Sequence, residues 1–466
     1  MYTAPRPRFL LSSTNIYYSR RGPNNPGKPV EARTENANQR LKNIVRRNRC
    51  SESVGIYSVC SAHPSVISAA IQQAIDDGSV LLVESTSSQV NQFGGYTGQT
   101  PDRFAEFVHS AATHAGLPRE RVVLGGDHLG PYPWRNESSA LALKNACELV
   151  RRCVVAGYVK IHLDASMGCA DDGKSGPDEL TVANRAAILC HAAESAHAAL
   201  PGASPLLYVI GTEVPVPGGE SVAGQSPVTT PAENVRRTLD VFRAAFEEQG
   251  VSPAWERVIG MVVQPGVEFG ENIVFNYDRQ RASALSSALP EHPSLVYEAH
   301  STDYQSPAGL RQMVEDHFAI LKVGPWLTFA FREAVFALSA IERELLAYRK
   351  DAQISQVREA LNAAMLRHPA HWRSYYHGSE DQTRLARLYS YSDRCRYYWV
   401  DAEVQKELAR LRANLDSNTI SPALWSQYLP SQYQAIRSGQ TTVDVEAAIQ
   451  EHIRTVLRVY AAACGK

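Results

Sequence analysis

The run Gly125-Gly126-Asp127-His128 places a carboxylate next to an imidazole at the end of a short apolar segment. An imidazole nitrogen can bind a divalent cation, and a carboxylate can move a proton to or from a sugar hydroxyl. Because neighbouring residues at a strand end point to different sides, we expect His128 to bind metal while Asp127 faces a small polyol. The alternative interpretation is a His–Asp hydrogen bond that holds a loop.

A second histidine, His300, also follows an apolar segment and is the best partner for His128 in a shared metal site. The third ligand is open between Glu213 and Glu268, and either carboxylate could act as the base instead. His162 lies inside an apolar segment, which favours a hydrogen-bonded core histidine. The metal we expect is Zn²⁺, with Mn²⁺ as the alternative. The predicted metal ligands are His128, His300 and Glu268, and the predicted catalytic groups are Asp127, Glu213 and Asp164.

Further polar residues follow other apolar segments or belong to the amide- and glycine-rich stretch 87–98. Side-chain amides and backbone N–H groups of such a loop can bind a polyol or a phosphate. A well-packed cover is the alternative for this stretch, and a capped turn is the alternative for Ser166. The predicted substrate-binding residues are Ser61, Glu84, Gln89, Asn91, Ser166, Gln264 and Lys322.

Eight short apolar segments, each followed by a stretch with helical spacing, must position these residues. We predict strands at 54–59, 80–84, 121–126, 159–163, 206–212, 257–263, 295–299 and 318–323. Strands that are almost continuously apolar suit a sheet buried on both faces, and eight such units predict an α/β fold, a (β/α)₈ TIM barrel over 41–350. The active site of such a barrel lies at the C-terminal ends of its strands, where the polar candidates fall.

Strand signals fade after about residue 350, and the spacing predicts helices at 353–367, 380–389, 401–414 and 442–462. We therefore expect an α-helical C-terminal region over 351–466. Its aromatic and basic stretch 389–399 could close over a phosphate, bind a partner subunit or pack on the barrel, and packing is our expectation. At the other end, residues 1–40 are predicted to be a flexible extension.

The composition indicates a protein of the cytoplasm that binds neither nucleic acid nor membrane. The 47 basic residues nearly balance the 48 acidic ones, so no overall field favours a polyanion. The eight cysteines form no C-x-x-C pair, and such scattered cysteines indicate reduced thiols. No apolar run approaches the ~20 residues that span a bilayer. No G-x-G-x-x-G follows the first predicted strand, and we expect no nucleotide cofactor.

The chain resembles the Z-subunit (GatZ/KbaZ) family of class II D-tagatose-1,6-bisphosphate aldolase. The resemblance begins near residue 41, runs to about 399 and beyond, and rests on IYSVCSAHP, SSQVNQFGGYTG, GGDHLGP, KIHLDASMGCADD, YVIGTEVPVPGG, VVQPGVEF, EAHSTDYQ and ILKVGP. It implies a TIM barrel related to class II fructose-bisphosphate aldolases and a role in galactitol, tagatose or N-acetylgalactosamine catabolism. Sugar phosphates, namely tagatose and fructose phosphates, are the ligands it implies. The family has also carried an older kinase label, which we set aside.

The resemblance also implies roles for individual residues. Asp127 matches the catalytic aspartate of class II aldolases, His128 the first zinc histidine and His300 a later one. The middle zinc histidine is replaced near Glu268, and the later asparagine segment reads Lys322-Val323-Gly324. A His/Glu/His set could still bind metal.

Three functions follow from the resemblance. The first is a Z-type subunit of the lyase that supports the activity and stability of a separate catalytic Y subunit. The second is an autonomous metal-dependent ketose or ketose-phosphate 4-epimerase, since some relatives resemble such enzymes. The third is a sugar-binding barrel without catalysis. A homo-oligomer is compatible with each of them.

Overall fold

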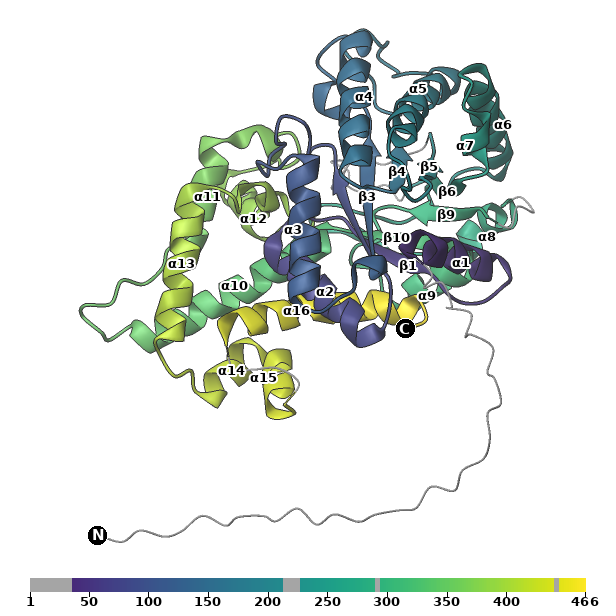
Figure 1. Cartoon of the computed structure of the whole chain (residues 1–466). Coiled ribbons are helices and arrows are strands. Elements are labelled where there is room, and N and C mark those ends of the chain that lie inside the picture. The colour runs from purple at the N-terminus through teal and green to yellow at the C-terminus, as the bar shows by residue number, and fades with distance from the viewer. Residues whose placement is uncertain (1–35, 213–226, 290–293, 440–443) are drawn as a thin grey trace, which may run out of the picture. The chain divides into compact units, whose positions relative to one another are not determined.

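Eight parallel strands form a closed barrel in the computed structural model, which describes residues 36–212, 227–289, 294–439 and 444–466. The spatial order is β1-β10-β9-β6-β5-β4-β3-β2 (Figure 1). The strands are β1 (Ile56–Val59), β2 (Leu81–Thr86), β3 (Val122–Leu129), β4 (Lys160–Leu163), β5 (Leu207–Ile210), β6 (Val258–Val263), β9 (Val296–Ala299) and β10 (Phe318–Val323). Every predicted strand is present, and the predicted TIM barrel is confirmed.

Helices cover the outside of this barrel (Figure 1). Those that follow barrel strands are α2 (Pro64–Asp77), α3 (Pro101–His114), α4 (Ser139–Val155), α5 (Glu179–Ala198), α6 (Ala232–Glu248), α9 (Pro307–Glu315) and α10 (Pro325–Leu346). The short α7 (Ser252–Trp255), the hairpin β7 (Glu268–Phe269) with β8 (Val274–Phe275), and α8 (Arg279–Ser287) lie in the connections on either side of β6.

The interior of the barrel is layered, apolar below and charged above. On β2 the buried Leu82 is followed two residues later by Glu84, and on β9 Val296 is followed by Glu298. Residues two apart on a strand share a face, so each of these pairs points inward. Leu82 and Val296 belong to one buried apolar cluster with other inward residues. The charged layer therefore rests on a dry floor.

Helix α1 (Ala37–Arg49), which the sequence analysis did not predict, completes this floor. Leu41, Ile44 and Val45 on one face of α1 are buried in the same apolar cluster as the lower layer of the barrel. Asn48 near its end donates hydrogen bonds to the carbonyls of Val54 and Val314, at 2.9 and 2.8 Å. The helix thus closes the end of the barrel opposite to the strand ends that carry the polar candidates.

After α10, the regular elements of the described residues are all helical. They are α11 (Val357–Arg367), α12 (Glu380–Tyr389), α13 (Ala402–Asp416), α14 (Pro422–Tyr428), α15 (Pro430–Arg437) and α16 (Val445–Ala463), with a 3₁₀ turn η4 at Arg394–Tyr398. The last helix, α16, packs against α2, α9 and α10 (Figure 1). The Tyr460 hydroxyl donates a 2.7 Å hydrogen bond to the Thr302 carbonyl, which ties α16 to the loop after β9.

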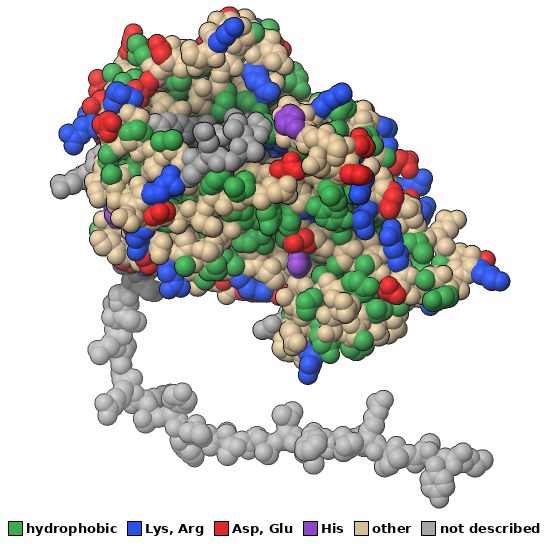
Figure 2. All heavy atoms as spheres, turned by 180° about the vertical axis from the view of Figure 1, so that it is seen from behind, with side chains coloured by type: hydrophobic (Ala, Val, Ile, Leu, Met, Phe, Trp, Pro, Cys, Tyr) green, Lys and Arg blue, Asp and Glu red, His purple; other side chains and the backbone are tan. Residues whose placement is uncertain are grey.

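On the face of the molecule that Figure 2 shows, positively charged Lys and Arg side chains are interspersed with negatively charged Asp and Glu. Within the described part of the chain, no helix combines the length and the apolar character that crossing a membrane requires.

The packing of α16 leads to a stability prediction. Leu457 on α16 is fully buried, so Leu457→Ala leaves a cavity and should lower the free energy of unfolding in urea by about 2–5 kcal/mol. Ala462 lies on the exposed side of the same helix, and Ala462→Ser should change that free energy by less than about 0.5 kcal/mol. Equal effects of the two substitutions would mean that α16 is not part of the folded core.

Candidate active site

A cavity of about 400 Å³ opens at the C-terminal ends of the barrel strands. This volume lies within the range of small-molecule sites. The lining combines polar groups from the strand ends, the stretch 87–98 and the C-terminal region. Its members include Cys60, Ser61, Thr86, Gln89, Tyr96, Asp127, His128, His300, Lys322, Arg396, Tyr397 and Trp399.

Buried ion pairs form the floor of this cavity. Lys160 on β4 contacts Glu84 and lies 2.7 Å from Glu298, all three fully buried. Lys322 on β10 also contacts Glu84 and lies 3.0 Å from an oxygen of Asp127. Removing either cation would leave an uncompensated buried carboxylate, which costs about 3–5 kcal/mol. Burial alone would raise the pKa of Glu298, but Lys160 and His300 lower it to about 2.

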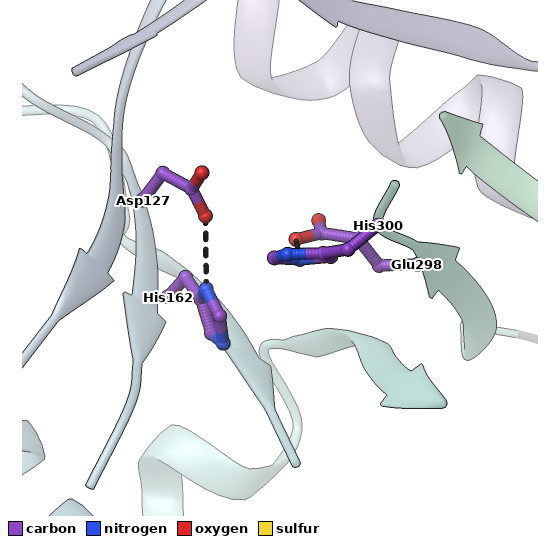
Figure 3. Close-up of side chains that lie close together, drawn as sticks. All are labelled: Asp127, His162, Glu298 and His300. Atoms are coloured by element: carbon purple, nitrogen blue, oxygen red, sulfur yellow. Dashed lines mark hydrogen bonds and ion pairs between the residues drawn. The ribbon is translucent and has the colours of Figure 1, made fainter. Parts of the chain in front are cut away.

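Three histidines stand above these pairs. The ring centroids of His128 and His300 lie 4.8 Å apart, and His162 lies 5.2 Å from His128 and 5.3 Å from His300. Asp127, His162, Glu298 and His300 offer one ligand atom each within 4.8 Å of one another. Figure 3 shows Asp127 and His162 facing Glu298 and His300 across a common space.

The hydrogen-bond partners of the two ring nitrogens of His162 indicate which nitrogen is available to a ligand. Asp127 lies 3.0 Å from Nδ1 of His162. Burial would raise the pKa of Asp127, but His128, the hydrogen bond from His162 and the charge of His300 hold it well below its usual range, so the ionised carboxylate accepts a hydrogen bond from Nδ1–H. The His128 N–H also lies 3.2 Å from Nδ1, but a charge-assisted bond is about twice as strong. The lone pair is then on Nε2, which is buried without a hydrogen-bond partner among the described residues.

This set of groups therefore fits a divalent cation. A metal-bound histidine normally uses one nitrogen as the ligand while the other donates to a carboxylate, as His162 does to Asp127. Glu298 and His300 supply further oxygen and nitrogen donors beside it.

A bulge places Asp127 and His128 on the same cavity. Between Gly126 and Leu129, β3 advances three residues while β4 advances two, and His128 has φ 48°, in the left-handed region. The extra residue breaks the alternation, so both side chains line the cavity instead of pointing to opposite sides as we expected. Gly125 serves the same arrangement, because a Cβ there would lie 2.8 Å from Cγ of Glu84.

Asp164 holds the His128 ring in place. One of its oxygens lies 2.8 Å from Nδ1 of His128, and the other accepts hydrogen bonds from the backbone and the hydroxyl of Ser166. Burial alone would lower the pKa of His128, but Asp127 and Asp164 raise it to about 9. The structure thus places Asp164 and Ser166 behind His128.

The other predicted site residues divide into three groups. Ser61, Gln89 and Lys322 line the cavity together with Asp127, His128 and His300. The side-chain oxygens of Asn91 and Gln264 accept hydrogen bonds within their own loops, from the backbone N–H groups of Gly95 and Gly266. Glu84 belongs to the ion pairs beneath the cavity. Glu268 is buried on β7, where its carboxylate accepts from the Phe269 N–H, and it is not among the clustered ligand atoms. Glu213 lies outside the described residues.

Lys160 and Glu298 were not predicted as site residues, and His162 was predicted only as a core histidine. Strand alternation could have found them. Lys160 and His162 are two residues apart on β4, and Glu298 and His300 are two apart at the end of β9, so each pair faces the same side.

One stretch carries the sequence pattern of a nucleotide-binding loop but not its structure. Residues 168–175, Gly-Cys-Ala-Asp-Asp-Gly-Lys-Ser, match the P-loop pattern G-x-x-x-x-G-K-[ST]. In a P-loop the lysine leads directly into a helix that binds phosphate. Here α5 begins only at Glu179, Lys174 and Ser175 are exposed, and Asp172 is bound by Arg185 and by the Cys169 N–H. The expectation of no nucleotide remains a prediction.

Comparisons with known proteins find a matching family and similar solved structures. The family described as D-tagatose-1,6-bisphosphate aldolase subunit GatZ/KbaZ-like matches residues 41–465. A solved structure described as a probable tagatose 6 phosphate kinase from Sinorhizobium meliloti 1021 is 43% identical, with a TM-score of 0.79, over 88% of this chain and 100% of that chain. A putative fructose-1,6-biphosphate aldolase from Coccidioides immitis is 14% identical, with a TM-score of 0.39, over 81% of this chain and 98% of that chain.

The ion pairs beneath the cavity lead to a second stability prediction. Lys160→Met removes the cation between Glu84 and Glu298 and should lower the free energy of unfolding by about 3–5 kcal/mol. Adding Glu298→Gln should recover part of this loss, because one uncompensated charge disappears. Lys144 on α4 is exposed, so Lys144→Met serves as the matched control with a change below about 0.5 kcal/mol. A Lys160→Met protein as stable as the parent would contradict the assignment of these pairs.

Proposed function

We propose that this chain, which belongs to the GatZ/KbaZ-like family of D-tagatose-1,6-bisphosphate aldolase subunits, itself acts on a ketohexose phosphate bound in the cavity. The observation that carries the proposal is the placement of Asp127, His162, Glu298 and His300 around one space at the barrel mouth. A barrel that only bound sugar would not require buried charges to be held in this way, because each costs several kcal/mol to desolvate.

His162, Glu298 and His300 would hold a divalent metal, and Asp127 would remain the proton carrier that orients His162. Such a metal would act as a Lewis acid on a substrate carbonyl. Zn²⁺ and Mn²⁺ both suit a set of imidazole and carboxylate donors. This assignment replaces the predicted ligands His128 and Glu268.

Asp127 is the group placed to remove a proton from the C4 hydroxyl of the sugar. As that proton moves to the carboxylate, the C4–O bond becomes a carbonyl, the C3–C4 bond breaks and its electron pair moves toward the C2 carbonyl. Return of the pair to the opposite face of the aldehyde, with the proton going back from Asp127 to the C4 oxygen, gives the C4 epimer. Departure of the aldehyde, with that proton going instead to C3 of the remaining enolate, completes an aldol cleavage. One proton carrier therefore serves both epimerisation and cleavage.

Support of a separate Y-type chain is the second candidate, because the family description names a subunit. The purified chain, loaded with Zn²⁺ or Mn²⁺, should be incubated with tagatose 6-phosphate, fructose 6-phosphate and tagatose 1,6-bisphosphate, alone and with a Y chain. Epimer or triose products from the chain alone support the first proposal, and products only with the Y chain support the second. Transfer of phosphate from added ATP, or no product in any mixture, would contradict both.

Substitution of the proton carrier gives the first functional prediction. Asp127→Asn keeps the shape of the side chain but removes the base, so kcat should fall by about 10²–10⁴ while KM changes by only a few-fold. Asp240 on α6 is exposed, and Asp240→Asn should leave both constants unchanged. Turnover by Asp127→Asn at the parent rate would show that Asp127 is not the proton carrier.

Metal binding gives the second functional prediction. After chelator treatment, Zn²⁺ titrated into the protein should bind at one site per chain in a calorimeter. His162→Ala and His300→Ala should each weaken this binding by at least about 10–100-fold, the cost of losing even an outer partner of a metal. His191 is exposed on α5 and His191→Ala provides the control. Equal affinities in all three variants would place the metal elsewhere.

A further inference from the structure

Three side chains that line the cavity within the described part of the chain carry a positive charge: His128, which is paired with Asp127 and Asp164, Lys322 and Arg396. Lys322 is neutralised by Glu84 and Asp127. Arg396 lies on η4, in the aromatic and basic stretch 389–399, and among the described residues no carboxylate forms an ion pair with it. This stretch therefore brings to the cavity a guanidinium that no carboxylate of the described residues contacts in an ion pair.

The hydrogen bonds of Arg396 leave part of its guanidinium free for a ligand. Nη1 donates to the carbonyls of Ser392 and Asp393, at 2.5 and 3.1 Å, and Nη2 donates to the Tyr397 hydroxyl at 3.0 Å. A guanidinium has five N–H donors, so these three bonds leave two without a protein acceptor among the described residues. Paired N–H groups of arginine suit the oxygens of a phosphate.

The segment that carries Arg396 is fixed to the barrel. Asp393 has φ 45° and is fully buried, where it pairs with Arg332 of α10 at 3.0 Å and accepts a 2.7 Å hydrogen bond from Thr328. The Tyr304 hydroxyl, in the loop after β9, donates to the Tyr391 carbonyl at 2.6 Å. Arg396 is thus presented to the cavity in a preorganised position, which limits the entropy lost on binding.

Aromatic side chains surround the guanidinium. The Tyr397 ring lies 4.6 Å from that of Tyr96, which also lines the cavity, and stacks on His371 at 4.4 Å. Burial would raise the pKa of Tyr397, but Arg396 and Arg394 lower it, which makes its hydroxyl a stronger hydrogen-bond donor. Arg394 is buried, with Nε and Nη2 lacking acceptors among the described residues. Both arginines therefore add to the positive potential around this hydroxyl.

We propose that Arg396 and Tyr397 bind the terminal phosphate of the ketose. Lys322 on the cavity floor is already paired with carboxylates, whereas Arg396 keeps two N–H groups for a ligand, so the phosphate binds at Arg396 while the sugar carbons lie toward Asp127. The proposal rests on the proposed function only for the identity of the sugar. It makes Arg396 a specificity-determining residue that separates phosphorylated from free ketoses.

The test is calorimetric binding, which does not depend on turnover. Tagatose 6-phosphate and free tagatose are titrated into the metal-loaded parent and into Arg396→Gln, Arg396→Lys and Arg373→Gln, in which an exposed arginine is replaced. Arg396→Gln should weaken tagatose 6-phosphate binding by about 10–100-fold and free tagatose binding by less than about twofold, as expected for one charge-assisted contact. Arg396→Lys should recover part of the loss, and Arg373→Gln should bind like the parent.

Other outcomes overturn the proposal. Equal weakening for both sugars would make Arg396 a structural residue, and no weakening for either would place the phosphate elsewhere. Binding of a ketohexuronate by the parent, with no binding of tagatose 6-phosphate, would mean that the rim takes a carboxylate instead. A parent protein that shows the phosphate-selective loss but no turnover would support this inference while contradicting the proposed function, so the two can fail separately.

Discussion

Three carboxylates and two ammonium groups share one layer of the barrel, and the arrangement of the mouth depends on their pairing. Glu84, Asp127 and Glu298 are buried above an apolar floor, and Lys160 and Lys322 supply countercharges to them. Water cannot reach this layer from below, because α1 closes the floor of the barrel. The ion pairs therefore fix the side chains from which the site is built.

Other features of the mouth follow from this constraint. Gly125 lacks the side chain that would collide with Glu84, and the bulge after it turns both Asp127 and His128 toward the cavity. A bulge of this kind stores some backbone strain, visible as the left-handed φ of His128, and such strain is commonly found at functional sites. Within the run Gly-Gly-Asp-His, Gly125 thus leaves space for the Glu84 side chain, and the bulge turns the side chains of Asp127 and His128 toward the cavity.

The barrel could be predicted from the sequence because its strands are short, apolar and regularly spaced. Elements stabilised by tertiary contacts could not: α1 is an ordinary amphipathic helix until its apolar face meets the barrel floor, and the two-residue strands β7 and β8 carry almost no pattern. In the site, the sequence placed Asp127, His128 and His300 on one cavity. It did not select Lys160 or Glu298, because a charged residue inside a strand conflicts with the expectation of an apolar core. For the stretch 389–399 the sequence left contact with a phosphate open but favoured packing, since only the fold brings Arg396 to the barrel mouth.

The central claim is that the barrel mouth is a metal-assisted sugar site of this chain itself. The most direct measurement is an anomalous-difference map from crystals grown with Zn²⁺ and tagatose 6-phosphate. We predict one zinc peak among His162, Glu298 and His300, with the C4 hydroxyl of the sugar next to Asp127. A zinc peak away from these residues, or a sugar bound outside the cavity, would contradict the account.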